Sequence, residues 1–315
     1  MNGIDLCFSS YMDEMQRQLG LWGENGQEKL QSACVAVAGL GGIGAVSALM
    51  LVKAGIGTVR VCDNDRYETP NIVEQMFASH ATVGACKVEA SVSELSKHTR
   101  IGVVEGFAGD LRNANDCARL LEGASLVVSA VDNPQARIAL GQAAEKRGIP
   151  FIVSANIGWT VIHTVYMPGA NSYKSMWKDH SGLAYLDSGY PNMDDSATAS
   201  AVKENWNIWV AAVSGFQPES MRKFLAEEVD FYWYSSPPAF FAGALGINDA
   251  LKILTGVKEV YEYPKLFIFD MKANRNWDWM TLGKRYAALK EAWPEGEAKI
   301  MEVIESWDRD RNLAG

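Results

Sequence analysis

An apolar run followed by closely spaced glycines is the segment of this sequence best suited to bind phosphate. The run Val35–Ala38 leads into Gly39, Gly41, Gly42 and Gly44, and a helix-like pattern follows. This order predicts a buried strand, a tight turn whose backbone can approach phosphate, and a helix N-terminus that attracts negative charge. Taken alone, such a glycine pattern usually indicates a nicotinamide or flavin cofactor.

The charged side chains that follow favour ATP instead. Asp63 ends the next strand-like run, where a carboxylate can accept hydrogen bonds from a ribose, but it would do the same in a dehydrogenase and does not discriminate between the cofactors. Lys87 opens a helix-like segment after a turn of small residues, and its ammonium group can reach a phosphate. Asp132 follows another strand-like run. It can hold Mg²⁺, which binds one or two carboxylates plus phosphate oxygens, or it can cap the next helix.

Three more polar residues belong to this candidate site. Asp65 follows Asp63 closely and is assigned with it to the nucleotide. Asn71 either binds the nucleotide or stabilises a turn after a proline. Arg137 lies in the helix-like segment after Asp132, and we expect it to order that loop rather than to contact ligand. These residues form one site only if the elements that carry them belong to one sheet.

Strand-like and helix-like segments alternate through the first half of the sequence, which predicts an α/β fold. We expect a doubly wound, mainly parallel, Rossmann-like sheet with helices on both faces. Ligands of such sheets bind outside the carboxyl ends of the strands, where the candidate loops begin. The predicted strands are 33–38, 59–62, 102–104, 126–130 and 151–154, and the predicted helices are 43–54, 84–95, 114–121 and 134–146.

The second half begins with a further strand, 159–167, and then changes character. Residues 168–200 are rich in Gly, Ser, Asp and Asn, which is typical of a loop or substrate lid. We therefore divide the chain into a nucleotide-binding part with an N-terminal helical arm, 1–167, and a C-terminal extension, 168–315, intergrown with it as one domain. The extension is predicted to contain helices 218–228 and 239–255, an antiparallel part with strand 265–271 and its neighbour 277–281, and a charged helix from Glu297.

Composition excludes several classes of protein. With 315 residues, a net charge of −9 and a pI near 5.1, the chain lacks the basic surface of a general nucleic-acid or anionic-membrane binder. No apolar stretch predicts a transmembrane helix or a signal peptide, so we expect a cytoplasmic protein. The five cysteines are widely separated, and none lies after Cys117, so they form no metal-binding pair.

The complete motif series resembles one family. It comprises Arg17-Gln18, Gly26-Gln27, the G-x-G-G-x-G of 39–44, the D-x-D of 63–65, an N-x-x-x-Q from Asn71 to Gln75, the G-x-x-K of 84–87, the D-N-x-x-x-R of 132–137 and the late helix 243–256. In this order and spacing, over about residues 11–281, the chain resembles the ThiF/MoeB/ubiquitin-activating superfamily of ATP-dependent adenylyltransferases. The resemblance adds Gln75 to the expected nucleotide-binding residues.

The resemblance implies a homodimer that uses ATP and Mg²⁺ to activate a carboxylate as an acyl adenylate. The substrate would be the C-terminal glycine of a small ubiquitin-like or sulfur-carrier protein, or of a peptide. Lys87 and Asp132 would act on phosphates and metal. In these enzymes an arginine at the place of Arg17 reaches across the dimer to the partner's triphosphate, so Arg17 is assigned a catalytic role in trans.

Two departures from the family pattern limit what the resemblance implies. The family's zinc-binding cysteines are replaced by Ser172 and Ser175 and by a cysteine-free C-terminus, so no zinc is expected and no enzyme thioester can form after Cys117. The family's phosphate-facing arginine is replaced by Glu74, which reverses the charge of that contact. An active enzyme must compensate: Arg66 pairs with Glu74 or supplies the missing cation, or Glu74 rotates away and Arg17 contributes more of the positive charge.

Two other functions remain open at this point. The chain can be a non-catalytic nucleotide-binding or structural subunit that pairs with an active homologue, which Glu74 favours and the retained Lys87 and Asp132 oppose. A nicotinamide-dependent oxidoreductase is the other alternative, and only the glycine loop supports it.

Overall fold

The protein is built around one eight-stranded sheet. The computed structural model describes residues 11–99, 102–169, 204, 207–208, 210–229, 233–257, 259–263, 265–277 and 279–312. The strand order is β3-β2-β1-β4-β5-β6-β7-β8, parallel from β3 to β5 and antiparallel from β5 to β8. The strands are β1 (Cys34–Ala38), β2 (Thr58–Asp63), β3 (Val103–Ala108), β4 (Leu126–Ser129), β5 (Phe151–Ile157), β6 (Thr160–Tyr166), β7 (Phe267–Asp270) and β8 (Arg275–Asn276).

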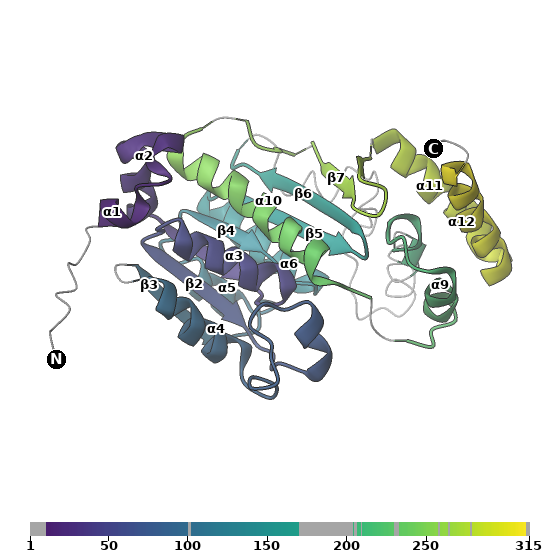
Figure 1. Cartoon of the computed structure of the whole chain (residues 1–315), viewed down its shortest axis with the longest axis horizontal. Helices are drawn as coiled ribbons and strands as arrows, with labels where there is room; N and C mark the ends of the chain where they lie inside the picture. The colour runs from purple at the N-terminus through teal and green to yellow at the C-terminus, as the bar shows by residue number, and fades with distance from the viewer. Residues whose placement is uncertain are drawn as a thin grey trace, which may run out of the picture.

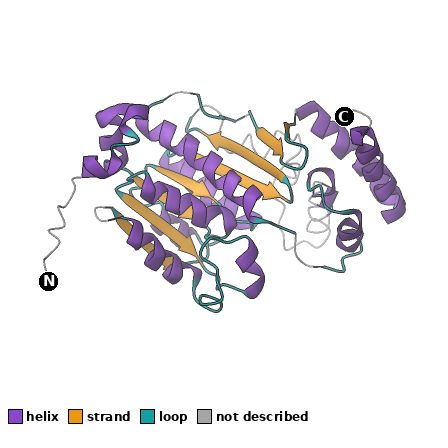
Figure 2. Cartoon of the chain, viewed as in Figure 1, coloured by secondary structure: helices purple, strands orange, loops and turns teal. Residues whose placement is uncertain are grey.

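Helices cover both faces of the parallel part, which confirms the predicted doubly wound α/β fold (Figures 1 and 2). One face carries α3, α4 and α10, and the other carries α5 and α6. Each predicted crossover helix is present, with ends that differ by a few residues. The helices are α3 (Gly42–Lys53), α4 (Lys87–Leu95), α5 (Ala114–Leu120), α6 (Pro134–Arg147) and α10 (Ser236–Thr255).

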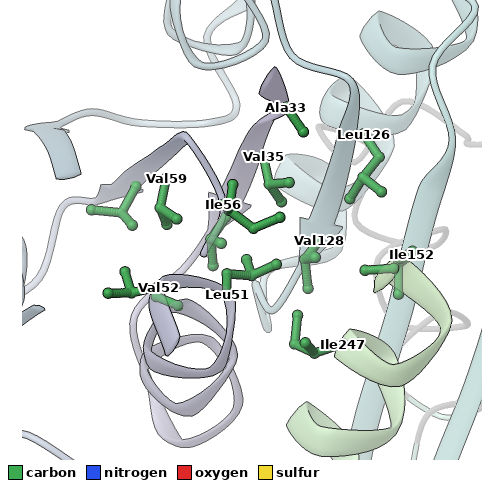
Figure 3. Close-up of a cluster of buried hydrophobic side chains, with 14 of the residues drawn as sticks. Ala33, Val35, Leu51, Val52, Ile56, Val59, Leu126, Val128, Ile152 and Ile247 are labelled. Atoms are coloured by element: carbon green, nitrogen blue, oxygen red, sulfur yellow. The ribbon is translucent and has the colours of Figure 1, made fainter. Parts of the chain in front are cut away.

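Alternate residues of the central strands supply two cores. Val35 and Val37 of β1 belong to the core on the α3 and α10 face. Figure 3 shows Val35 of this core near Leu51 of α3, and Ile247 of α10 near Val128 and Ile152. Ala36 and Ala38, which alternate with Val35 and Val37 along β1, belong to the opposite core with residues of α5 and α6. Because both faces are covered, β1 and β4 consist almost entirely of apolar residues, as the continuous hydrophobic runs in the sequence predict.

The late helix α10 connects the two halves of the chain. It packs against α3, α2 (Leu19–Ser32), β5 and β6, so residues far apart in sequence form one hydrophobic core. It ends at Gly256 with a left-handed backbone (φ 81°), as the sequence predicts for a C-cap glycine. The strands β7 and β8 then extend the same sheet.

The C-terminal region differs from the prediction at one element. Segment 277–281 is not a strand, because α11 (Trp279–Ala292) begins within it and the antiparallel neighbour of β7 is the short β8. Trp277 continues the ladder by one backbone hydrogen bond to Ile268, and its ring then packs beneath Arg285 at 4.1 Å. The Trp277 side chain is buried in the hydrophobic cluster that joins the C-terminal helices to β5 and β7.

These C-terminal helices form a third hydrophobic cluster at the β7–β8 end of the sheet (Figure 1). The cluster joins α9 (Pro218–Leu225), α11 and α12 (Glu297–Asn312), and the last of these confirms the predicted charged helix. The predicted lid, 168–200, lies outside the described residues apart from 168 and 169. Among the described helices, none is both long enough and apolar enough to cross a bilayer.

Candidate functional site

The glycine loop lies where the winding of the sheet reverses. From β1 the chain runs outward to β2 and β3, then crosses to β4 on the other side of β1, which makes the β1–β4 boundary the switch point. Gly39 has φ +87°, and a side chain on it would meet the Ala130 carbonyl oxygen at 2.7 Å. A Cβ at Gly44 would lie 1.8 Å from the Gly39 oxygen. Glycine is therefore required for the loop to pass this close to β4 and to the start of α3.

Asp63 holds this loop from the end of β2. Its two carboxylate oxygens accept hydrogen bonds from the backbone amides of Leu40 (2.6 Å) and Asp65 (2.8 Å). Burial raises the pKa of Asp63, against the opposing effects of Lys87 and of these two amides. The carboxylate thus joins the glycine loop to the β2 loop, and its free lone pairs can still accept from a ribose.

Lys87 begins α4, where its side chain is only 8% exposed, and its ammonium lies 3.2 Å from the carboxylate of Asp65. Asp65 is 63% exposed, so one member of the ion pair is accessible and the other is buried. The amide of Lys87 also donates to the Asp65 carbonyl at 2.9 Å. This arrangement holds a buried cation close to the glycine loop. The sequence predicted that Lys87 and Asp65 bind the nucleotide, but not that they pair with each other.

Glu74 lies against the glycine loop itself. A Cβ on Gly42, the first residue of α3, would be 2.5 Å from Oε2 of Glu74. The side-chain amide of Gln75 donates to Glu74 Oε1 at 2.7 Å. Burial raises the pKa of Glu74, Lys87 opposes this shift, and the nearby negative charge of Asp132 adds to it. Glu74 thus lies against the loop that the sequence predicts to bind phosphate, and its effect on a bound phosphate stays a prediction.

Arg66 does not pair with Glu74 in the described structure. Its guanidinium donates to the carbonyl oxygen of Gly84 at 2.8 Å, and this bond ties together the two ends of the segment before α4. The expected pairing of Arg66 with Glu74 is therefore wrong for this conformation, and a role of Arg66 as the cation at the phosphates stays a prediction.

The structure shows the hydrogen bonds that Asn71 and the neighbour of Asp132 make within the protein, while their binding of nucleotide or metal stays a prediction. Asn71 Oδ1 accepts from the Glu68 amide at 2.9 Å in a reciprocal cap of a short 3₁₀ helix, so its side chain stabilises the turn. Asn133, not Asp132, caps α6 by accepting from an amide at 3.0 Å. Asp132 remains exposed at the end of β4. Arg137 donates to the carbonyl of Val131 and orders the loop, as expected.

Arg17 lies far from this site within one chain. It is exposed in the turn between α1 (Tyr11–Met15) and α2. Its neighbour Gln18 donates to the Ala54 carbonyl at 2.9 Å, and Gln27 donates to the same oxygen at 3.0 Å. Both glutamines thus bind the C-terminal end of α3, whereas the glycine loop is at its N-terminal end. The R-Q and G-Q pairs share a structural role that the sequence did not reveal.

The sequence patterns did not predict a buried polar network that links β5, β6 and α10. Ser154 Oγ lies 2.9 Å from Nδ1 of His163, and Nε2 of His163 lies 3.1 Å from Asp249 Oδ2. All three residues are at most 1% exposed. Asp249 also accepts from the Tyr261 amide at 2.9 Å and from Lys252 at 3.2 Å. The order Ser-His-Asp has the form of a hydrolase triad, but burial in the core gives it a structural role between β5, β6 and α10.

The described cysteines and carboxylates limit covalent and metal chemistry in that part of the chain. Burial raises the pKa of Cys62 to about 12 and that of Cys117 to about 11, so both are neutral thiols near neutral pH. No three His, Cys, Asp or Glu side chains in the described ranges are placed to hold a metal ion by themselves. The carboxylates of Glu74 and Asp132 are close enough to interact. Ser172 and Ser175 lie outside the described residues.

Curated relatives match about half of this chain. The sulfur carrier protein ThiS adenylyltransferase of Bacillus subtilis is 33% identical over 150 residues, which are 47% of this chain and 44% of that protein. The molybdopterin-synthase adenylyltransferase of Salmonella typhimurium is 33% identical over 135 residues, 42% of this chain and 53% of the relative. The chain therefore spans about half the length of these two relatives.

Solved structures share the fold over most of the chain, and a family profile matches it. The E. coli MccB structure with ATP gives a TM-score of 0.62 at 20% identity, covering 84% of this chain and 69% of that chain. The PaaA structure gives a TM-score of 0.62 at 19% identity, covering 88% of this chain and 76% of that chain. At such low identity these likenesses establish the fold alone. The ThiF family profile matches residues 15–289. Because that match covers well over half of the sequence, this protein belongs to the ThiF family.

Proposed function

We propose that this chain is an ATP- and Mg²⁺-dependent adenylyltransferase that converts a C-terminal carboxylate into an acyl adenylate. One observation carries the proposal: the glycine loop, its anchor Asp63 and the loop of Asp132 follow the carboxyl ends of β1, β2 and β4, and the buried Lys87 pairs with Asp65 of the β2 loop. This is the edge at which doubly wound sheets bind nucleotides. Family membership and the names of the curated relatives support the same reaction.

The chain's own residues would act by position and charge. The backbone amides at the start of α3 would face the phosphates, and Lys87 would neutralise charge that develops on the phosphoryl oxygens. Asp132, with its exposed carboxylate, would hold Mg²⁺, which when bound neutralises the triphosphate and orients the leaving pyrophosphate. In-line attack of the substrate carboxylate on the α-phosphate then needs alignment rather than a covalent enzyme intermediate.

The proposed substrate is a small ubiquitin-like or sulfur-carrier protein, or a peptide. Two curated relatives are named for a sulfur carrier protein as substrate, and E. coli MccB has been crystallised with MccA. The neutral thiols of Cys62 and Cys117 oppose transfer of the acyl group to either of these residues. In our proposal the adenylate passes to a nucleophile from another molecule.

A non-catalytic nucleotide-binding or structural subunit is the second candidate. The observation in its favour is the carboxylate of Glu74 against Gly42, where a phosphate would approach. The two candidates differ in ATP–pyrophosphate exchange, measured with small proteins ending in Gly-Gly that are encoded beside this chain. Exchange supports the enzyme. ATP binding without exchange, for every such partner, supports the subunit.

ATP with Mg²⁺ should stabilise the protein, and NAD or NADP should not. A ligand that binds only the folded state at a hundred times its Kd adds about 2.7 kcal/mol to the free energy of unfolding. We therefore expect ATP with Mg²⁺ to raise Tm in a thermal unfolding experiment. A rise with NAD and none with ATP would contradict the adenylyltransferase and favour an oxidoreductase.

Arg17 should act across a homodimer. Because α1 and α2 bind the far end of α3, Arg17 can reach a nucleotide only from a partner chain. Arg17→Ala and Lys87→Ala chains should each be inactive alone, while their mixture forms heterodimers with one complete site. Activity should recover to about a quarter of the wild-type value at random exchange, since half the dimers then carry one of two sites.

Subunit exchange has to be measured in the same mixture, by native mass spectrometry of one isotopically labelled chain. Heterodimers without recovered activity would show that Arg17 does not act in trans. Full activity of the Arg17→Ala chain alone would remove the residue from the site altogether.

A further inference from the structure

The side chain of Gln27 lies at the centre of a hydrogen-bond network under the N-terminal helices. It is 0% exposed, and its Oε1 accepts from the side-chain amide of Gln18 at 3.0 Å and from the indole N–H of Trp22 at 2.9 Å. Its Nε2 donates to the hydroxyl of Tyr11 at 2.6 Å and to the carbonyl oxygen of Ala54 at 3.0 Å. The amide therefore uses both of its N–H donors and accepts two bonds at its oxygen.

This network holds residues 11–22, which we call the arm, against the C-terminal end of α3. Gln18 donates to the Ala54 carbonyl at 2.9 Å, and the hydroxyl of Tyr11 donates to the carbonyl of Gly55 at 2.6 Å. The last carbonyl groups of a helix lack partners within the helix, so they can accept from the side chains of the arm. Gly55 has φ 81°, and a Cβ there would lie 2.6 Å from the Tyr11 hydroxyl, so glycine leaves room for this contact.

The first part of the arm depends on these hydrogen bonds for its orientation. A kink at Gly23, with φ 72°, separates the arm from the rest of α2, and Trp22 beside it packs against the core on the α3 and α10 face. By contrast, α1 has no buried residue, so burial of apolar surface does little to fix it. Arg17 is exposed in the turn after α1 and adjoins Gln18. The bonds of Gln18 and Gln27 thus fix the backbone from which the Arg17 side chain extends.

We propose that Gln27 is a positioning residue that holds Arg17 toward the nucleotide of the partner subunit. The 12 residues of α3 make it about 18 Å long, and the glycine loop of the same chain lies at its other end. Arg17 therefore points away from its own site, and its placement in the partner's site depends on how rigidly the arm is held. A displacement of about 1 Å in such a group can cost about 10²-fold in rate. The inference rests on the proposed function and on the role of Arg17 in trans.

Gln27→Leu tests the proposal, because leucine fills a similar space without making hydrogen bonds. The kcat of ATP–pyrophosphate exchange should fall at least about tenfold in this variant, measured with a Gly-Gly protein that supports exchange by the wild type. Gln31→Leu is the matched control. It makes the same substitution at an exposed position of the same helix and should retain wild-type exchange.

Mixtures of chains separate positioning of Arg17 from a general loss of stability. In a dimer of Gln27→Leu with Lys87→Ala, the first chain supplies an intact loop and the second an intact arm, so one site is complete. Exchange activity should recover to about a quarter of the wild-type value when subunits mix at random. A dimer of Gln27→Leu with Arg17→Ala has no intact arm, so its activity should stay at the level of the two parents. A substitution that only destabilised the chain would not distinguish the two mixtures.

Tyr11→Phe gives the same test with a smaller change, for use if Gln27→Leu unfolds at the assay temperature. It keeps the aromatic ring and removes the hydroxyl that bonds to Gly55 and Gln27. The loss of exchange should be smaller than in Gln27→Leu. Lys87→Ala should restore the activity of this variant and Arg17→Ala should not.

The outcomes separate this inference from the proposed function. Wild-type exchange by Gln27→Leu would overturn the inference and leave the adenylyltransferase intact. The same conclusion follows if Lys87→Ala restores the Arg17→Ala chain but not the Gln27→Leu chain, with subunit exchange measured in both mixtures. If Lys87→Ala restores neither chain, Arg17 does not act in trans and the inference is wrong. A wild-type protein that binds ATP without any exchange would overturn both proposals.

Discussion

Lys87→Ala is expected to reduce acyl-adenylate formation by about 10²–10³-fold, since loss of a preorganised group that stabilises developing phosphoryl charge has effects of this size. The buried ammonium is held beside the glycine loop by Asp65, and it acts electrostatically on Asp63 and Glu74. Without the Lys87 ammonium, the bound phosphates would face these carboxylates with no nearby positive charge from Lys87. ATP–pyrophosphate exchange measures the effect, with kcat and KM determined separately.

Two variants separate this role from packing and from general charge. Lys87→Met keeps an apolar stem of similar size and should lose as much activity as Lys87→Ala while unfolding at a similar Tm to the wild type. Lys97→Ala removes an exposed cation at the end of the same helix region, where the side chain is 64% exposed, and should leave exchange unchanged. Equal exchange rates for Lys87→Met and the wild type would show that the ammonium does not act on the phosphates.

Asp249→Ala is expected to lower the free energy of unfolding by about 3–5 kcal/mol, the usual cost of removing one partner from a buried charge network. The carboxylate is fully buried and accepts from His163 (3.1 Å), the Tyr261 amide (2.9 Å) and Lys252 (3.2 Å). Without it, the buried donors of His163 and Tyr261 lose their acceptor. Urea unfolding of the variant and the wild type measures the difference.

Asp249→Asn and Glu219→Ala provide the comparison. The amide of Asn keeps one acceptor oxygen, so this variant should lose about half as much stability. Glu219 is an exposed residue of α9, and its replacement should change the free energy of unfolding by less than about 0.5 kcal/mol. If Asp249→Ala unfolded like Glu219→Ala, the buried network would not stabilise the junction of α10 with the sheet.

The buried carboxylate of Asp249 is also expected to make the protein less stable in acid. Burial by itself would raise the pKa of Asp249, but the hydrogen bonds from His163 and the Tyr261 amide outweigh it, and the pKa falls below its ordinary value of 3.8. A depressed pKa in the folded state stabilises the protein above the unfolded-state pKa, and this stabilisation disappears as pH falls through the folded-state value. Asp249→Asn should therefore show a weaker acid dependence below about pH 4.

The sequence by itself determined the elements that carry local patterns. The apolar runs at 33–38 and 126–130, the glycines after the first run and the prolines and glycines at helix ends act over a few residues, so they can be interpreted without the fold. Strand and helix in alternation then leave few ways to build the sheet. The loops of Gly39–Gly44, Asp63 and Asp132 were thereby predicted at one edge of the sheet, and the structure places them there. The strand expected at 277–281 was wrong, because α11 begins within this segment and Trp277 is buried in a cluster shared by the sheet and helices distant in sequence.

Only the tertiary structure decided which side chains are partners. The Lys87–Asp65 pair, the bond from Arg66 to Gly84 rather than to Glu74, and the network of Ser154, His163 and Asp249 join residues between 9 and 86 positions apart. Such contacts depend on the angles at which packed elements meet, and no pattern along the chain records those angles. For the same reason the position of Glu74 against Gly42 became a question about phosphate only once α3, α10 and the 3₁₀ turn were placed together.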